Sequence, residues 1–398
     1  MVEQNCDALI PAYLPLLLCV SLFKIIMNRK ETIGLVTFSS TYDNYGQVLQ
    51  ALAIQEYLKE RGHEVILLRK PVHTYDYIKP YIKLIVKKTL SLFSNSSYLQ
   101  RSYEIDKKNF KNRKIARKNE KIHTRFFEEF RKRHFVIASN DEKSLEKKQI
   151  TVLCAGSDQI WGVRNSFHFL DFGNKVVKRI SIASSTGNSP VKESEKLKIS
   201  KWLKAFSLIT VREDSGVAMC NELGINKAIK ILDPTLLHDY TFYNKYKSQA
   251  ISKDYIFVYL LSAKTGLSYE EIFEFSQKNG LDVKYVTGQG REDDNEKLYA
   301  TIPEWLSLMN EAKYVITNSF HGMAFSIIYR KQFLVLPRIG ELSQNERISC
   351  LAHEMGLEER VYKNNLDELF MPIKYEKAEK ALSDNRQKLN ILLEEVNL

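Results

Sequence analysis

The chain has 398 residues and a formal net charge of +11 at pH 7, which indicates a negatively charged partner. Hydrophobic residues make up 44% and charged residues 27% of it, a balance that excludes a disordered chain and suffices for two ordinary α/β domains. The five cysteines are scattered without C-x-x-C spacing. They argue for a reducing compartment and against a zinc site or a disulfide framework.

The first 26 residues precede the first predicted strand. An uncharged run of 16 residues at 8–23 contains two prolines, and a membrane-spanning helix needs roughly 20 residues. Acidic residues lie upstream of the run, where a signal peptide has a positive segment. We therefore expect 1–26 to be an extension outside the fold of a cytoplasmic protein. If the run did insert into a membrane, the basic residues that follow it would keep the remainder in the cytoplasm.

The first domain is expected over 27–245. A strand at 33–38, a polar loop, a helix at 47–61, the glycine Gly62 and a strand at 64–68 form the typical opening of a doubly wound α/β domain. The same alternation resumes near residue 150. The further predicted strands are 150–154, 179–183, 208–211 and 230–232, with helices over 193–206 and 216–223.

A basic segment at about 75–150 interrupts this domain. Between 101 and 150, basic residues outnumber acidic ones by 16 to 8. The segment is predicted to be helical, notably over 121–133. Its charge indicates either solvated helix faces or a surface that binds an acidic glycan or a lipid phosphate. Binding to a lipid phosphate would mean a peripheral contact with the inner membrane face. Nucleic acid is not expected, because its phenylalanines are spaced as a helix core.

The second α/β domain is expected over 246–372. It begins with a strand at 255–260 and contains the stretch AKYVITNSFHGMAFSII at 312–328. That stretch predicts a strand at 314–316, a loop and a helix at 323–329. A C-terminal helix is expected within 373–398. Two such domains predict an α/β protein with a central cleft, where the loops at the carboxyl ends of both sheets would converge.

The loop before the helix at 323–329 carries Asn318, Ser319, His321 and Gly322. A helix N-terminus favours an anion, and a histidine there can act as an acid or a base near neutral pH. The alternative is a helix cap beside a histidine that only packs.

Three other loops also follow predicted strands. Arg212 can bind a carboxylate or phosphate through two parallel hydrogen bonds, or pair with a neighbouring acid. The loop Ser157-Asp158-Gln159 can hold a polar acceptor, with Asp158 as a base, or serve as a turn cap. Asp43, Asn44 and Gly46 can form an anion nest or cap a helix.

Familiar nucleotide and metal motifs are absent from the sequence. There is no GxxxxGK[ST], HExxH or GxSxG, and no convincing GxGxxG follows a strand. The eight histidines lack metal-ligand spacing. We therefore predict no metal ion and no dinucleotide cofactor.

The ordered set of motifs over residues 32–365 resembles the polysaccharide pyruvyl transferase family. The motifs are TYDNYGQVLQALAIQEYLKERGHEV, LCAGSDQIW, VREDSG, ILDPTLL, AKYVITNSFHGMAFSIIYRKQFLVLPR and NERISCLAHEMGLEERV. The resemblance implies two Rossmann-like domains of the GT-B type. It also implies transfer of pyruvate from phosphoenolpyruvate onto two hydroxyls of a sugar, giving a cyclic ketal and phosphate. By motif, the arginine and histidine of the family fall on Arg212 and His321.

We hypothesise that the donor is bound by Arg212, the Asn318–Ser319 turn and Gly322, with Arg338 and Arg347 as further candidates. His321 would protonate C3 of the donor, and Asp158 or His321 would take the proton of a sugar hydroxyl. The resemblance implies phosphoenolpyruvate as a co-substrate, and no cofactor is expected. It also implies an acceptor in a cell-surface polysaccharide or its precursor, free or linked to a nucleotide or lipid. The acceptor-side candidates are Asn44, Gly46, Gln47, Ser157, Gln159 and Ser185.

Two other functions remain open from the sequence. A GT-B glycosyltransferase that uses a nucleotide sugar would need a ribose-binding carboxylate, for which Glu358 or Glu359 is a candidate. A non-catalytic protein that binds acidic polymers would use the basic stretch at 101–150.

Overall fold

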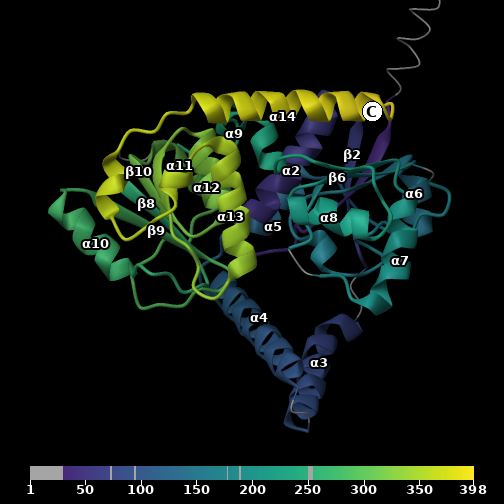
Figure 1. Ribbon diagram of the computed structural model, residues 1–398, viewed down its shortest axis with the longest axis horizontal. Coiled ribbons are helices and arrows are strands. Elements are labelled where there is room, and N and C mark those ends of the chain that lie inside the picture. The colour runs from purple at the N-terminus through teal and green to yellow at the C-terminus, as the bar shows by residue number, and fades with distance from the viewer. Residues whose placement is uncertain (1–29, 72–73, 94–95, 177, 188–189, 250–253) are drawn as a thin grey trace, which may run out of the picture.

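The computed structural model describes residues 30–71, 74–93, 96–176, 178–187, 190–249 and 254–398 (Figure 1). The extension expected at 1–26 lies outside these residues. The described chain forms two α/β domains, each built on a parallel sheet, joined side by side and spanned by the C-terminal helix. This is the α/β, GT-B-like arrangement that the sequence predicted.

The N-terminal domain is built on a seven-stranded parallel sheet with the order β3-β2-β1-β4-β5-β6-β7. The order reverses between β1 and β4, so the loops after these two strands open at the topological switch point. Central strands such as β4 and β6 are buried at every position, as expected for strands covered by helices on both faces. The strands are β1 (Thr32–Val36), β2 (Glu64–Arg69), β3 (Ile137–Ser139), β4 (Val152–Ala155), β5 (Lys178–Ser184), β6 (Leu208–Val211) and β7 (Ala228–Lys230).

Helix α2 (Tyr45–Glu60) is the central helix of this domain. Its buried residues lie all around the helix, because α2 packs on the sheet and also against the second domain. The other helical elements are α5 (Phe127–His134), α6 (Glu142–Lys147), η1 (Ile160–Gly162), α7 (Glu193–Lys204), α8 (Asp214–Glu222), η2 (Pro234–Leu237) and α9 (Tyr240–Asn244).

The C-terminal domain is built on a four-stranded parallel sheet with the order β11-β10-β8-β9. Its switch point lies between β8 and β10, which are neighbours in the sheet but not in the sequence. The strands are β8 (Tyr255–Leu261), β9 (Asp282–Gly288), β10 (Tyr314–Thr317) and β11 (Gln332–Val335). The helical elements are α10 (Tyr269–Lys278), α11 (Ile302–Glu311), α12 (Phe320–Ile328), α13 (Leu342–Met355), η3 (Glu358–Arg360) and η4 (Leu366–Phe370).

Helix α14 (Glu376–Glu394) runs back from the C-terminal domain across the N-terminal one (Figure 1). Asn385 accepts a hydrogen bond from the amide of Leu232 at 2.8 Å, and Arg386 donates to the carbonyl of Leu237 at 2.7 Å. One hydrophobic cluster contains core residues of both sheets. The two domains are therefore held together by apolar packing as well as by the crossing helix.

The basic segment differs in two ways from its prediction as a helical insertion. The helices α3 (Thr74–Leu92) and α4 (Ser97–Ile122) form a projecting hairpin (Figure 1), but β3 within 75–150 is a strand that pairs with β2. The helix expected over 121–133 is also wrong, because α4 ends at Ile122 and α5 begins at Phe127. Phe126 has a left-handed backbone (φ 53°), and Arg125 turns inward to donate to the carbonyl of Thr287 at 2.7 Å. This tertiary contact interrupts the helical pattern.

Candidate active site

The carboxyl ends of the two sheets meet at one place between the domains. Nε2 of His321, at the start of α12, lies 3.7 Å from Oδ2 of Asp233, which follows β7. The guanidinium of Arg212, which follows β6, lies 4.7 Å from the ring centre of Phe320. The predicted convergence of both sets of loops is thus present. Helix α2 adds a third contact, because Gly46 in its first turn lies against His321.

Asp233 is the hub of this site and is 1% exposed. Its Oδ2 accepts hydrogen bonds from Ser157 at 2.9 Å and from Nη1 of Arg212 at 2.7 Å, while its Oδ1 caps η2 through the amide of Thr235 at 3.0 Å. Burial by itself would raise the pKa of this carboxyl, but His321 and Arg212 outweigh it and hold the pKa well below its ordinary value. Asp233 therefore presents a fixed negative charge to His321. The 3.7 Å separation is that of an ion pair rather than of a hydrogen bond.

Arg212 is held by two carboxylates. Besides Asp233, Oε1 of Glu213 accepts from its Nε at 2.8 Å, so the pairing with a neighbouring acid that the sequence left open is present, and the acid is Glu213. Asp214 pairs with Lys230 instead. In the described part of the chain, Nη2 of Arg212 is buried and has no hydrogen-bond partner.

Arg347, on α13, lies beside Arg212. Its guanidinium is 4.9 Å from the ring centre of Phe320, so two cations share contact with one aromatic ring. Burial and the nearby Arg212 lower the pKa of Arg347 to about 10. Its Nε is buried, lies 3.6 Å from Oε1 of Glu213, and makes no hydrogen bond to the described residues. Two adjacent guanidinium groups thus each retain an unused N–H.

His321 and Gly322 lie in the first turn of α12, whereas the sequence placed them in a loop. Ser319 has an extended backbone and caps the helix, because its Oγ accepts from the amide of Gly322 at 3.2 Å. The cap expected as the alternative is thus present, and it uses the Ser319 hydroxyl. A Cβ on Gly322 would lie 2.3 Å from Oγ1 of Thr317, so Gly322 allows the helix to pack closely on β10.

Asn318 and Arg338 brace the wall of the site. The side chain of Asn318 accepts from the amide of Leu261 at 2.7 Å and donates to its carbonyl at 3.2 Å, which ties β10 to β8 at the switch point. Nε of Arg338 donates to the carbonyl of Asn318 at 2.8 Å, and its Nη1 to Glu341 at 3.1 Å. The Asn318 amide is therefore occupied by backbone groups.

The loops after β4 and β5 line the same region. Ser157 joins the Asp233 hub, and Oγ of Ser185 donates to Oε1 of Glu213 at 2.7 Å. Asp158 has a left-handed backbone (φ 57°), and its carbonyl accepts from the amide of Ser185 at 3.0 Å, which links the loop after β4 to the loop after β5. Its carboxylate acts electrostatically on both Arg212 and Arg347. Gln159 instead packs against Gly187.

The N-terminus of α2 completes the site. Asn44 caps this helix, because its side chain accepts from the amide of Gln47 at 3.3 Å, so the capping alternative holds for Asn44. The side chain of Gln47 is partly exposed. Gly46 lies against His321, since a Cβ on Gly46 would be 2.1 Å from Nδ1 of the histidine.

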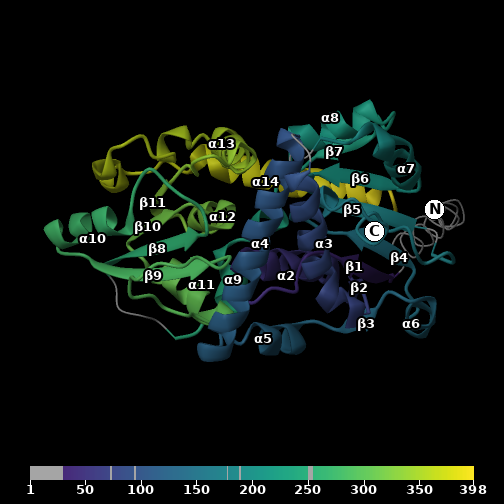
Figure 2. The same cartoon turned by 90° about the horizontal axis from the view of Figure 1, so that it is seen from below.

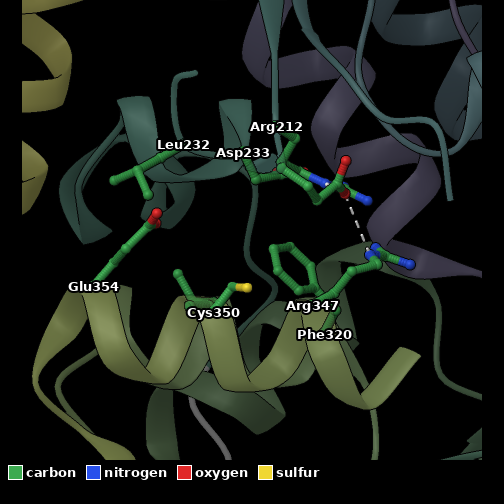
Figure 3. A pocket seen from close by; sticks show the side chains of 9 residues that line it. Arg212, Leu232, Asp233, Phe320, Arg347, Cys350 and Glu354 are labelled. Atoms are coloured by element: carbon green, nitrogen blue, oxygen red, sulfur yellow. Dashed lines mark hydrogen bonds and ion pairs between the residues drawn. The ribbon is translucent and has the colours of Figure 1, made fainter. Parts of the chain in front are cut away.

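A cavity of about 20 Å³ lies between the Arg212–Asp233 pair and α13. Figure 3 shows Arg347, Cys350 and Glu354 along α13, facing Arg212 and Asp233. Among the described residues, no group of three or more His, Cys, Asp or Glu side chains is arranged to hold a metal ion. The lining residues are Arg212, Glu213, Leu232, Asp233, Phe320, Arg347, Cys350, Leu351 and Glu354.

The sequence did not single out Asp233 or Phe320, and it did not pair Glu213 with Arg347. A signal for Asp233 was present, because it follows a strand within ILDPTLL, the same position that selected Arg212 and Asp158. No comparable signal existed for Phe320, which reads as an ordinary core residue.

The sequence profile of the polysaccharide pyruvyl transferase family matches residues 44–338, which include the loops after β4, β5, β6, β7 and β10. The chain belongs to this family. Arg347 lies beyond the matched segment of this pyruvyl transferase family member. No curated protein matched the chain.

Several solved structures are similar to this family member over most of its length. UDP-GlcNAc 2-epimerase from Methanocaldococcus jannaschii is 11% identical, with 92% of this chain and 99% of that chain covered and a TM-score of 0.42. An α-glucosyltransferase in complex with UDP is 11% identical, with 91% and 99% covered and a TM-score of 0.40. The Streptomyces sp. SF2575 glycosyltransferase SsfS6 is 10% identical, with 90% and 96% covered and a TM-score of 0.36.

Proposed function

We propose that this family member transfers pyruvate from phosphoenolpyruvate onto two hydroxyls of a sugar in a cell-surface polysaccharide or its precursor, forming a cyclic ketal and releasing phosphate. One observation carries the proposal. Three buried nitrogen atoms without hydrogen-bond partners in the described chain, Nη2 of Arg212, Nε of Arg347 and Nε2 of His321, surround the Phe320 ring where the domains meet.

The two arginines suit an anionic donor. Phosphoenolpyruvate carries a carboxylate and a phosphate, and guanidinium groups bind both in forked geometry. A buried N–H without a partner costs about 1–3 kcal/mol, which a bound anion would recover. The lowered pKa of Arg347 means that its charge is disfavoured in the free protein. An anion beside it would reverse that effect.

His321 is the candidate acid and base. Protonation of C3 of phosphoenolpyruvate converts its double bond into a methyl group and leaves a cationic carbon at C2. The first sugar hydroxyl forms a C–O bond to C2 and gives up its proton. Phosphate then leaves with the electron pair of its C–O bond, and the second hydroxyl closes the ketal. Of the two hydroxyl protons, one replaces that delivered to C3 and the other leaves with phosphate.

Asp233 and Asp158 support this chemistry in different ways. Asp233 is a positioning residue, because it holds Arg212 directly and keeps a negative charge 3.7 Å from His321. Asp158 remains the second candidate for the base, since its carboxylate is electrostatically coupled to both arginines.

Binding of the substrates requires the domains to separate. A cavity of about 20 Å³ holds about one water molecule, far less than a three-carbon phosphate ester and a sugar need. The contacts between the domains would then re-form around the reactants and exclude water.

The nucleotide-sugar alternative has less support. Glu358 pairs with His353 and Glu359 with Arg360, and both glutamates are more than half exposed on η3. Neither lines the cavity beside Arg212. A thermal-shift titration with phosphoenolpyruvate and with nucleotide sugars separates the two functions, since only the true ligand stabilises the folded protein.

The direct test is phosphate release from phosphoenolpyruvate across a panel of sugar acceptors. We expect the His321→Ala variant to lose this activity while its circular dichroism spectrum and its cooperative thermal unfolding show that it is still folded. His353→Ala is the matched control, because that histidine is 80% exposed and lies outside the site. Phosphate release that survives in His321→Ala would overturn the assignment.

A further inference from the structure

We propose that the α3–α4 hairpin docks on a bilayer that contains anionic lipids, with α3 lying along its surface. The hairpin projects from the body of the protein (Figure 1), and it crosses the region between the two domains in Figure 2. A peripheral contact with a membrane was already compatible with the charge of the sequence. The structure supplies the face and its relation to the site.

The positive charge of the protein is concentrated on this hairpin. Residues 74–122 contain thirteen lysines and arginines against four aspartates and glutamates, a net +9 of the chain's +11. The rest of the chain is therefore almost neutral. Such a local excess attracts an anionic surface, and the attraction weakens as salt is added.

Helix α3 also exposes an apolar face. Ile78, Ile82 and Ile85 are 51%, 44% and 65% exposed and are spaced three or four residues apart, so they lie on one side of the helix. Soluble monomers rarely leave such a contiguous apolar surface in water. The large exposed apolar residues of α3 and its end are Ile78, Tyr81, Ile82, Ile85, Val86, Leu90, Leu92 and Phe93.

The apolar face of α3 is turned away from its partner helix. The side that meets α4 is mostly polar, because Lys83 and Lys87 pair with Asp106, and Lys87 also donates to Ser102 at 2.6 Å. Tyr81, stacked edge-on against Phe110, is an apolar contact between the helices. A helical hairpin in water normally buries its apolar faces against each other, so this reversed arrangement points to an outside partner.

A bilayer fits both properties at once. The apolar face is flanked by Lys79 and Lys88 on the two sides of the helix, the pattern of helices that lie in a membrane interface. An acidic polymer in solution would satisfy the lysines but leave the isoleucines exposed. Helix α3 is 19 residues long, or about 28 Å, and none of the helices described is long and apolar enough to cross a membrane. A helix lying on the surface is therefore the geometry we infer.

The hairpin also touches the loops that build the candidate site. Two residues of α4 contact the C-terminal domain. Oδ1 of Asn112 accepts from Oγ of Ser262, which follows β8, at 3.5 Å, and Lys108 pairs with Glu341 at 2.8 Å. Glu341 in turn pairs with Arg338 in the wall of the site. A bilayer that binds α3 would therefore be connected to these loops through α4. We infer that the acceptor sugar is carried on a lipid in that bilayer, a point that rests on the proposed function.

The test is co-sedimentation of the full chain with vesicles of phosphatidylcholine, alone or mixed with phosphatidylglycerol. We expect binding to the mixed vesicles only, decreasing with salt. The double variant Ile82→Glu, Ile85→Glu should bind at least about tenfold more weakly. Leu197→Glu is the matched control, because this leucine is 86% exposed on α7, and its binding should be unchanged.

Three outcomes would overturn the docking. Binding that persists in the double variant would place the contact elsewhere in the chain. Equal binding to both vesicle types would show that attraction between the lysines and anionic lipids does not drive the binding. Retention of the double variant by an acidic polysaccharide, with no vesicle binding by the wild type, would identify a polymer as the partner.

Activity measured alongside separates this proposal from the enzyme function. With a water-soluble acceptor, phosphate release by the double variant should equal that of the wild type, which also shows that the variant is folded. Docking without any phosphate release would defeat the proposed function and the lipid-linked acceptor, and leave the docking intact. Phosphate release without docking would contradict the docking and the lipid-linked acceptor, and leave the proposed function intact. Equal turnover of the wild type on free and vesicle-borne acceptors would exclude the preference for a lipid-linked acceptor.

Discussion

Gly46 and His321 belong to different domains and lie in direct contact, since a Cβ on Gly46 would lie 2.1 Å from Nδ1 of the histidine. Gly46 is in the first turn of α2, and His321 is in the first turn of α12. Contacts of a real Cβ are not found below 3.0 Å. The position of the His321 ring therefore depends on the missing side chain of a residue in the other domain.

This contact predicts an unusual effect of Gly46→Ala. In a helix, replacement of glycine by alanine normally stabilises a protein by about 0.5–1 kcal/mol. Here the methyl group would displace the His321 ring, and a displacement of about 1 Å can cost about a hundredfold in turnover. Phosphate release and thermal unfolding measure the two effects. Gly266→Ala is the control, since an added Cβ there meets nothing within 4 Å. Wild-type turnover in Gly46→Ala would contradict the prediction.

Asn318→Ala should affect stability more than donor binding. The amide of Asn318 bonds both backbone groups of Leu261, and loss of a partner for a buried N–H costs about 1–3 kcal/mol. We expect urea denaturation to show a loss of this size, with little change in the KM for phosphoenolpyruvate of the folded fraction. Asn279→Ala, which removes an exposed hydrogen bond at the C-terminal end of α10, serves for comparison. A raised KM at unchanged stability would instead make Asn318 a donor ligand.

The sequence was sufficient where local patterns decide the structure. Outside the basic segment at 75–150, the strands and helices predicted for both domains followed from short apolar runs that end in polar loops. Arg212 and His321 were identified as candidates because each follows a strand, and the two sheets do bring them together. The start of α12 was misplaced, because histidine and glycine are weak helix formers. The Ser319 cap overrides that preference.

What the sequence could not supply depends on contacts between distant residues. The link from Arg212 through Asp233 to His321 spans both domains. The pairing of Arg347 with Phe320 and Glu213 has the same character. Such contacts leave no periodic signal. The outward apolar face of α3 was also hidden, because periodicity shows that a face exists but not which way it points.

Arg125 is predicted to hold the domains closed. It is 2% exposed, and its Nη1 donates to the carbonyl of Thr287 at 2.7 Å and to the hydroxyl of Tyr45 at 3.2 Å. Arg125→Gln should weaken this contact and shift the free protein toward an open form with a larger radius of gyration in small-angle X-ray scattering. Turnover should fall, because the site is assembled from both domains. Arg330→Gln, whose ion pair with Glu379 is exposed, should change neither quantity. An unchanged radius in Arg125→Gln would argue against this role.

Asp233→Asn should lower stability in a pH-dependent way. The pKa of Asp233 is held well below its ordinary value of 3.8, because His321 and Arg212 outweigh the effect of burial. Its contribution to stability is therefore complete above about pH 4, and it is lost as the pH falls below 3.8 toward the lowered pKa. At pH 7 the variant leaves Arg212 partly uncompensated, and breaking a buried ion pair costs about 3–5 kcal/mol. Urea denaturation over a pH series should show this difference from the wild type shrinking in acid. The exposed Asp254→Asn should stay close to the wild type throughout. A difference that did not vary with pH would show that the charge of Asp233 is not what stabilises the site.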